Sequence, residues 1–289
     1  MEGVEPIIVV LGAFGGGTSA VAGVLHHLGV FMGTEFDWAW REPHETWEDA
    51  RISQLCRRAF TVPGGQLQMD AGSFEAKLRE WADDHRRAAG NAGQPPGVKQ
   101  PLLCVVVDVI RDACGPVLPV VVDRPFDEVV GSLNRLGWWK DEQERAESTA
   151  HLIAARDRAL EGAATVRVDF KGLRAEPAVV IRRLADELAL KVTEAQVEAA
   201  VESIVQAADV HDEDPYGLDL LLARVERNPD DQRSVYLLAQ IYYNMLGEFG
   251  NARKWYARWL EMGVGSDEEI YQAMYRVAAS MDNTGEPWP

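Results

Sequence analysis

One segment near the start of the chain, VVLGAFGGGTSAVAGVL, constrains the fold more than any other. An apolar run over 7–11 leads into glycines and then two hydroxyl residues, in the order Gly12, Gly15, Gly16, Gly17, Thr18 and Ser19. Glycines let the backbone turn tightly with its amides exposed, and a helix N-terminus adds partial positive charge. We therefore predict a buried strand, a phosphate-binding loop and a helix over 18–28, in preference to a plain strand-to-helix turn.

The spacing within this loop restricts which phosphate it binds. Gly12 and Gly17 fit the nucleoside-triphosphatase frame G-x-x-x-x-G-K-[ST], but Thr18 stands where that frame requires Lys. Without the Lys, the point charge that grips a γ-phosphate is missing. A nucleotide kinase is therefore the less favoured interpretation, and a ligand with one 5′-phosphate and a transferable group beyond it is favoured.

Strand and helix patterns alternate through the first part of the chain. Further buried strands are expected over 117–122 and 165–168, and helices over 126–136, 142–160 and 179–188. The segment GNAGQPPG over 90–97 predicts a loop. This alternation is typical of an α/β domain with a parallel sheet flanked by helices.

The charge and cysteine content exclude several classes of protein. With 29 basic and 46 acidic side chains, the formal net charge of −17 disfavours binding to nucleic acid or an anionic membrane. The apolar runs are too short for a membrane span, and the N-terminus does not resemble a secretory signal. The three scattered cysteines form no Cys-x-x-Cys pair, so we expect a reduced, cytoplasmic protein with no metal site.

Three segments resemble the sulfotransferase family that uses PAPS (3′-phosphoadenosine 5′-phosphosulfate). LGAFGGGTSAVAGVLHHLGVFMG is similar to its 5′-phosphosulfate loop, VVVDRPFDEVVGSL to its 3′-phosphate motif, and GVKQPLL to a strand end that carries a Lys. The resemblance covers about residues 5–205. It implies PAPS as donor, 3′,5′-ADP as product, and Lys99 facing the sulfuryl group. It assigns the nucleotide to Gly15, Gly16, Gly17, Thr18, Ser19, Arg124 and Ser132.

Arg124 is also a candidate phosphate-binding residue on grounds independent of the family resemblance. It follows a predicted buried strand, and ligands gather at the carboxyl ends of such strands in open α/β sheets. Arg supplies a permanent planar fork of donors, and the Ser132 hydroxyl adds a further donor. The alternative is a surface ion pair of Arg124 with Asp123 or Asp127.

Sulfuryl transfer to a hydroxyl needs a base, which the resemblance places in the segment TEFDWAWREPHETWEDARISQLCRRAF. HETWED is similar to a Gly-x-x-Glu-Asp stretch of bacterial members, which indicates Glu48 first and His44 second. A helix is expected over about 48–60, where Asp49 serves as a cap. Trp47 and its neighbouring tryptophans either pack in the core or stack on an acceptor.

The loop departs from the family at one position. The family carries Lys or Arg where this chain has Gly15, so a cation beside the leaving phosphate is missing. Backbone amides, Lys99 or Arg41 are candidates to compensate. The departure keeps open a second hypothesis, a catalytically silent nucleotide-binding domain.

The last part of the chain has helical spacing only. Helices are expected over 219–227, 232–246, 251–261 and 268–281, and NPDDQRSVYLLAQIYYNMLGEFGNARKWYARWLEMG resembles tetratricopeptide (TPR) repeats. NTGEPWP looks like the entry to another repeat, which suggests a truncated array. The expected division is a sulfotransferase-like domain over 1–208, an acidic linker over 209–215, and a small all-α TPR-like domain over 216–289.

Together these patterns predict a PAPS-dependent sulfotransferase. Its acceptor would be a hydroxyl on a carbohydrate, glycolipid or natural product, and the TPR-like tail would recruit a protein partner. The alternative is a silent domain for 3′-phosphoadenosine nucleotides joined to the same interaction module.

Overall fold

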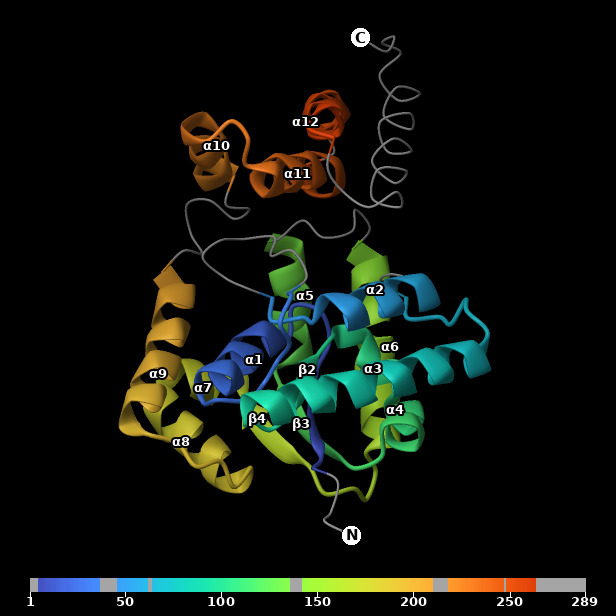
Figure 1. Ribbon diagram of the computed structural model, residues 1–289, viewed down its shortest axis with the longest axis vertical. Coiled ribbons are helices and arrows are strands. Elements are labelled where there is room, and N and C mark those ends of the chain that lie inside the picture. Colours follow the sequence, from blue (N-terminus) through green and yellow to red (C-terminus); the bar gives the residue numbers. More distant parts are fainter. Residues whose placement is uncertain are drawn as a thin grey trace. The chain divides into compact units, whose positions relative to one another are not determined.

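The computed structural model describes residues 5–36, 46–61, 64–135, 142–209, 218–246 and 248–263. These residues fall into two compact units (Figure 1). The first contains the described residues up to 133 and those of 142–209, and the second contains those from 218 onward.

A parallel sheet of four strands forms the centre of the first unit. Its strands are β1 (Ile7–Leu11), β2 (Gly97–Lys99), β3 (Val117–Asp123) and β4 (Val166–Asp169), in the spatial order β2-β1-β3-β4. Val10 of β1 pairs with Lys99 on one side and with Val120 on the other. The predicted α/β class and parallel sheet are thus confirmed, and all four carboxyl ends lie at one edge.

Helices cover both faces of this sheet because β1 is apolar on both sides. Ile7, Val9 and Leu11 face one cluster of buried side chains, and Ile8 and Val10 face the other. The first cluster packs under α2 (Ala50–Ala59), α3 (Ala71–Ala92), α4 (Val107–Cys114), α5 (Phe126–Arg135) and α6 (Glu142–Ala159). The second packs under α1 (Thr18–His27), α7 (Phe170–Ala175), α8 (Pro177–Glu187) and α9 (Glu194–Asp209).

Two element boundaries differ from the sequence prediction. The loop expected over 90–97 is wrong in its first half, because α3 continues to Ala92 and ends at Gly93 with a φ of 65°. Its buried face, which includes Trp81 and Ala89, outweighs the propensity cost of Gly90 in the last turn. The helix expected from 48 begins at Ala50, because Asp49 caps it by accepting hydrogen bonds from the Arg51 and Ile52 amides.

The described part of the second unit is helical. It comprises α10 (Leu218–Arg227), α11 (Gln232–Gln240), a π-helical segment (Ile241–Leu246) and α12 (Phe249–Glu261) around a core with Tyr256 and Trp259. The single helix expected over 232–246 therefore changes its hydrogen-bond pattern after Gln240. The helix expected over 268–281 and linker residues 210–215 lie outside the described residues, and Asp209 is the last residue of α9.

Two expectations from the sequence concern the cysteines and the absence of a membrane span. Cys56, Cys104 and Cys114 are free and buried. Burial raises the pKa of Cys104 to about 12 and that of Cys114 to about 11, so both stay as unreactive thiols. No helix in the described ranges has the length and apolar character needed to cross a membrane.

Asp49 offers a test of how α2 is held. Besides the two amides of its own helix, Asp49 accepts a hydrogen bond from Trp81 Nε1 of α3 at 3.1 Å, and it is only 7% exposed. We expect Asp49→Ala to lower the free energy of unfolding by about 2–4 kcal/mol, the sum of a lost cap and a stranded indole N–H.

The matched control is Asp70→Ala, since Asp70 caps α3 through the Ser73 amide but lies exposed. Its loss should be about 1 kcal/mol, the value of a cap alone. Urea unfolding measures both variants, and equal losses would contradict the role of the Trp81 contact.

Candidate functional site

The glycine loop turns at residues that only glycine tolerates well. Gly15 and Gly17 have φ of 72° and 87°, in the left-handed region. The Gly16 amide donates to the Ala13 carbonyl at 3.0 Å, and a Cβ on Gly16 would lie 2.8 Å from that same oxygen. The three glycines therefore close a tight turn that ends at the N-terminus of α1, as the sequence predicted.

Gly17 also lets another element approach. A Cβ on Gly17 would lie 2.3 Å from a ring atom of Phe170, the first residue of α7. Thr18 is buried, and its methyl group would be 2.7 Å from a Cβ on Gly12. The Thr18 side chain therefore packs against the loop backbone, while Ser19 is the half-buried hydroxyl beside it.

Lys99 and Glu48 meet directly beside this loop. Lys99 Nζ contacts Glu48 Oε1 and donates a hydrogen bond to Ser19 Oγ at 3.0 Å. The Lys99 side chain is 4% exposed and the Glu48 side chain 12% exposed. The structure thus brings together a lysine of β2, a carboxylate just before α2 and a hydroxyl of α1, three residues that the sequence proposed separately.

Two residues that sequence reasoning missed hold the other oxygen of Glu48. Ser53 Oγ donates to Glu48 Oε2 at 2.9 Å, and Gln100 Nε2 donates to the same oxygen at 3.3 Å. The orientation of the Gln100 amide is fixed, because its Oε1 accepts the Leu102 backbone N–H at 2.6 Å. Glu48 Oε2 therefore accepts the hydrogen bonds that hold the carboxylate in place, and Oε1 is the oxygen that faces Lys99. Only the adjacency of Gln100 to Lys99 hints at this in the sequence.

Arg124 lies on the opposite side of the loop from Lys99. Its Nη1 donates to the Gly15 carbonyl at 2.8 Å, and its guanidinium carbon lies 4.9 Å from the centre of the Phe170 ring. Its Nε is 3.5 Å from Glu128, and the side chain is 10% exposed. Asp123, one of the two ion-pair partners considered from the sequence, instead forms a bidentate pair with Arg167 at 2.6 and 2.7 Å.

The remaining predicted residues form no hydrogen bond or ion pair with Lys99 or Glu48, or lie outside the described residues. Ser132 is half-buried in the second half of α5, because that helix already begins at Phe126. His44 and Arg41 fall outside the described residues. Trp47 is half-buried and packs against the core: its ring stacks on His26 with centroids 4.2 Å apart. Burial lowers the pKa of His26, which fits a structural role.

Strand order explains why these groups assemble. β1 lies between β2 and β3, so the loop after β1 has Lys99 on one side and Arg124 on the other. Ligands bind at this edge of open α/β sheets because loops diverge there. The site therefore combines a glycine loop at a helix N-terminus, a buried cation next to a carboxylate, and a second cation across the loop.

Comparisons with known proteins give fold-level likenesses. No family model matches the sequence, and a search of curated proteins finds no relative. One similar solved structure is the sulfotransferase domain from the Synechococcus PCC 7002 olefin synthase, with 15% identity, 74% of this chain and 84% of that chain covered, and a TM-score of 0.46. Another is the sulfotransferase STF9 from Mycobacterium avium, with 13% identity, coverage of 78% and 77%, and a TM-score of 0.44.

A third similar structure is a sugar kinase from Janibacter sp. HTCC2649, with 20% identity, coverage of 64% and 95%, and a TM-score of 0.37. At these identities and TM-scores, the likenesses assign no function to this chain. The assignment has to come from the chemistry of the site.

Gly17→Ala tests the close packing of the loop. Alanine at this position would have to adopt a left-handed conformation, which costs about 1–2 kcal/mol of folding free energy. Its Cβ would also displace the Phe170 ring, which costs about 1–3 kcal/mol in addition. The control is Gly93→Ala, because Gly93 also has a positive φ but a Cβ there has no neighbour within 4 Å. Urea unfolding should show a larger loss of unfolding free energy for Gly17→Ala than for Gly93→Ala. Equal losses would mean that the contact with Phe170 adds nothing to the cost.

Proposed function

We propose that this protein is a sulfotransferase that moves a sulfuryl group from PAPS to an acceptor hydroxyl. The observation that carries the proposal is the buried Lys99–Glu48 pair, hydrogen-bonded to Ser19 of a phosphate-type loop. A triphosphatase loop would carry its cation inside the loop, where this chain has Thr18. Here the cation arrives from the neighbouring strand and is paired with a carboxylate, which suits transfer to a hydroxyl better than hydrolysis of a nucleoside triphosphate.

The loop and Arg124 fit the two ends of the donor nucleotide. The helix N-terminus and the glycine backbone would hold the 5′-phosphate. Arg124, together with Ser132, would bind the 3′-phosphate, because a guanidinium beside the loop is a permanent bidentate donor. A donor held in this way would have its sulfuryl end toward Lys99 and its 3′ end toward Arg124.

The reaction forms one bond and breaks one. The acceptor oxygen attacks sulfur in line, the bond from sulfur to the 5′-phosphate oxygen breaks, and 3′,5′-ADP leaves with the electron pair. Lys99 would stabilise the charge that grows on the leaving oxygen, taking the role of the cation missing at Gly15. Glu48 Oε1 would accept the acceptor's proton, while Ser53 and Gln100 keep Oε2 in place.

Gly15 favours one alternative function. A loop without its own cation could bind a 3′-phosphoadenosine nucleotide without catalysing transfer. In that case the helical unit would be the functional part. Ala252 and Tyr256 of α12 are both fully buried, as the small and large positions that interlock neighbouring helices in TPR arrays would be, which supports recruitment of a protein partner.

Thermal-shift measurements with 3′,5′-ADP, ATP and 5′-AMP separate these hypotheses. Stabilisation by 3′,5′-ADP well above that by the other two supports a PAPS-type site, through the linkage between binding and stability. Stabilisation by ATP alone would instead indicate a kinase. Release of 3′,5′-ADP from PAPS in the presence of a phenol such as 2-naphthol then distinguishes transfer from silent binding.

Arg124→Ala should weaken 3′,5′-ADP binding by about 1.5–3 kcal/mol, the value of a hydrogen bond to a charged group. The affinity for 5′-AMP should hardly change, because 5′-AMP has no 3′-phosphate. Calorimetric titration measures both ligands, with Arg79→Ala as the control because Arg79 is an exposed arginine on α3. Equal losses for the two nucleotides would show that Arg124 does not bind the 3′ end.

Removing either partner of the buried pair should slow transfer. We expect Lys99→Met to reduce turnover much more than 3′,5′-ADP affinity, since the charge it meets grows in the transition state. Glu48→Gln should lower turnover by on the order of 10²–10⁴-fold if Glu48 is the base. Near-normal turnover in Glu48→Gln would transfer that role to His44.

Stability provides a readout of the same pair without activity. Lys99→Met leaves a carboxylate buried without its cation and should cost about 3–5 kcal/mol. The double variant Glu48→Gln/Lys99→Met should recover much of that loss, because no unpaired charge remains. Additive losses would mean that the two side chains do not act as a pair.

A further inference from the structure

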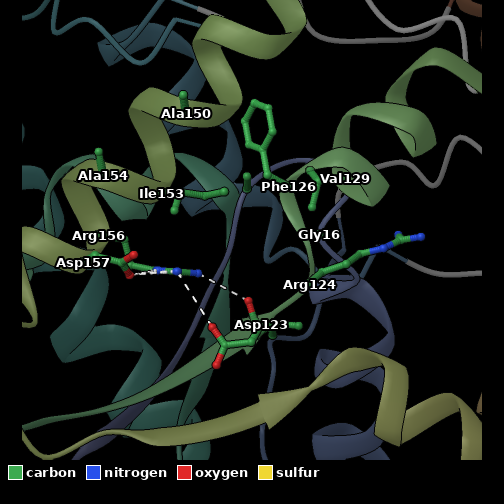
Figure 2. Close-up of a pocket in the computed structure, with 12 residues that line it drawn as sticks. Gly16, Asp123, Arg124, Phe126, Val129, Ala150, Ile153, Ala154, Arg156 and Asp157 are labelled. Carbon is green, nitrogen blue, oxygen red and sulfur yellow. Dashed lines mark hydrogen bonds and ion pairs between the residues drawn. The ribbon is translucent and has the colours of Figure 1, made fainter.

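A cavity of about 450 Å³ opens beside the glycine loop, between the end of β3 and helices α5 and α6 (Figure 2). Its lining includes Gly16 and Arg124, which the proposed function assigns to the donor, and neither Lys99 nor Glu48. Under that function, the cavity belongs to the donor side of the site. The Lys99–Glu48 pair is supported from another direction, by residues around α3.

Lys99 lies on a strand with little support of its own. β2 has three residues and stands at the edge of the described sheet, where it pairs with β1 only. The Gly97 amide donates to the Phe31 carbonyl at 2.9 Å, so it points away from β1. The amide and the carbonyl of one strand residue point in the same direction. The buried Gly97 carbonyl therefore needs a donor from outside the sheet.

His85 of α3 supplies that donor. Its Nε2 lies 2.9 Å from the Gly97 carbonyl oxygen, and because a carbonyl only accepts, Nε2 carries the hydrogen. The other ring nitrogen, Nδ1, lies 3.9 Å from Asp49 Oδ2. The ring stacks on Trp81 with centroids 4.8 Å apart and packs against the Phe31 ring at 5.1 Å, and His85 is 4% exposed. Both nitrogens are therefore fixed in direction.

Burial determines the protonation state of this ring. It lowers the pKa of His85, although the Asp49 charge and the carbonyls of Gly97 and Phe31 oppose the shift, and Arg86 adds to it. The ring is therefore neutral at neutral pH. In this state it donates from Nε2 to β2 and presents Nδ1 toward Asp49.

His85 thus connects the two chain segments that carry the ion pair. On one side it holds Gly97, two residues before Lys99 in β2. On the other side it faces Asp49, which directly follows Glu48 and caps α2. Lys99 Nζ meets Glu48 Oε1 only while the end of β2 and the start of α2 keep their distance. A single buried ring between the two segments sets that distance.

We propose that His85 is a positioning residue that keeps Lys99 and Glu48 in register for transfer, through Gly97 and Asp49 and without touching a substrate. The proposal rests on the sulfotransferase function and names a residue that controls its rate. Without the Nε2 donor, the edge strand would shift and the pair would separate. A misplacement of about 1 Å can slow a reaction on the order of a hundredfold. The nucleotide, held by the loop, would bind as before.

Three variants of the full chain test this role. His85→Leu removes both ring nitrogens at similar volume, and His85→Gln keeps an amide N–H at the place of Nε2. The control is Phe74→Leu, at another buried aromatic residue of α3, whose ring packs on Phe60 at the far end of α2. Urea unfolding of all three separates a loss of activity from a loss of stability. If His85→Leu does not fold, His85→Asn replaces it, because its amide is too short to reach Gly97.

Turnover and the ion pair itself are measured separately. Turnover is the release of 3′,5′-ADP from PAPS with 2-naphthol, and the pair is followed by the NMR signal of the Lys99 ammonium group, assigned by its absence in Lys99→Met. We expect His85→Leu to lower kcat by about ten- to hundredfold, with KM for PAPS and 3′,5′-ADP affinity unchanged. It should also shift or remove the Lys99 signal. His85→Gln should recover most of both, and Phe74→Leu should change neither.

Parent-like kcat with an unchanged Lys99 signal in His85→Leu would overturn the inference. Equal losses of kcat in His85→Leu and Phe74→Leu would overturn it as well, because a destabilised α3 would then explain both. If the parent chain releases no 3′,5′-ADP from PAPS, the sulfotransferase function fails instead. The Lys99 signal would still decide whether His85 positions the pair, so the two failures can be told apart.

Discussion

The buried contact between Lys99 and Glu48 is the interaction on which the arrangement of the site depends. An ammonium group that is almost fully buried is costly unless a charge and hydrogen bonds compensate it. Here the compensation comes from three elements, because Lys99 ends β2, Glu48 precedes α2 and Ser19 lies on α1. The ion pair therefore fixes the distance between the phosphate loop and the helix that carries the carboxylate. Its partners Ser53 and Gln100 keep that carboxylate from rotating.

The central strand divides the site into two sides. Alternate residues of β1 face opposite clusters, so the helices that carry the loop and the helices that carry the carboxylate pack on different faces of one sheet. Arg124 contacts Phe170, which packs on the α1 side, and it also lines the cavity beside α5 and α6.

Sequence reasoning worked where one local pattern determines the outcome. The apolar runs of β1 and β3 and the glycine loop have unambiguous local signals, and the structure forms them within a residue or two of the expected bounds. Sequence reasoning was less accurate where tertiary packing determines the bounds or the type of an element. The burial of Ala89 stabilises α3 through Gly90, and the change to π-helical hydrogen bonding after Gln240 has no local signal in the sequence. Ser53 and Gln100 had no signal, because a polar residue next to a buried one acquires its partner only in three dimensions.

The position of β1 also has a consequence for folding. Both partners of this strand are synthesised after it, since Val9 pairs with Val98 on one side and with Pro119 on the other. Until both partners have been synthesised, the segment IIVVL has two unpaired edges and no cover on either face. Such long-range parallel pairing forms slowly, because the intervening chain has to be ordered before the contacts stabilise it. The strand that carries the glycine loop thus stays without its sheet partners until the chain has been synthesised past Pro119.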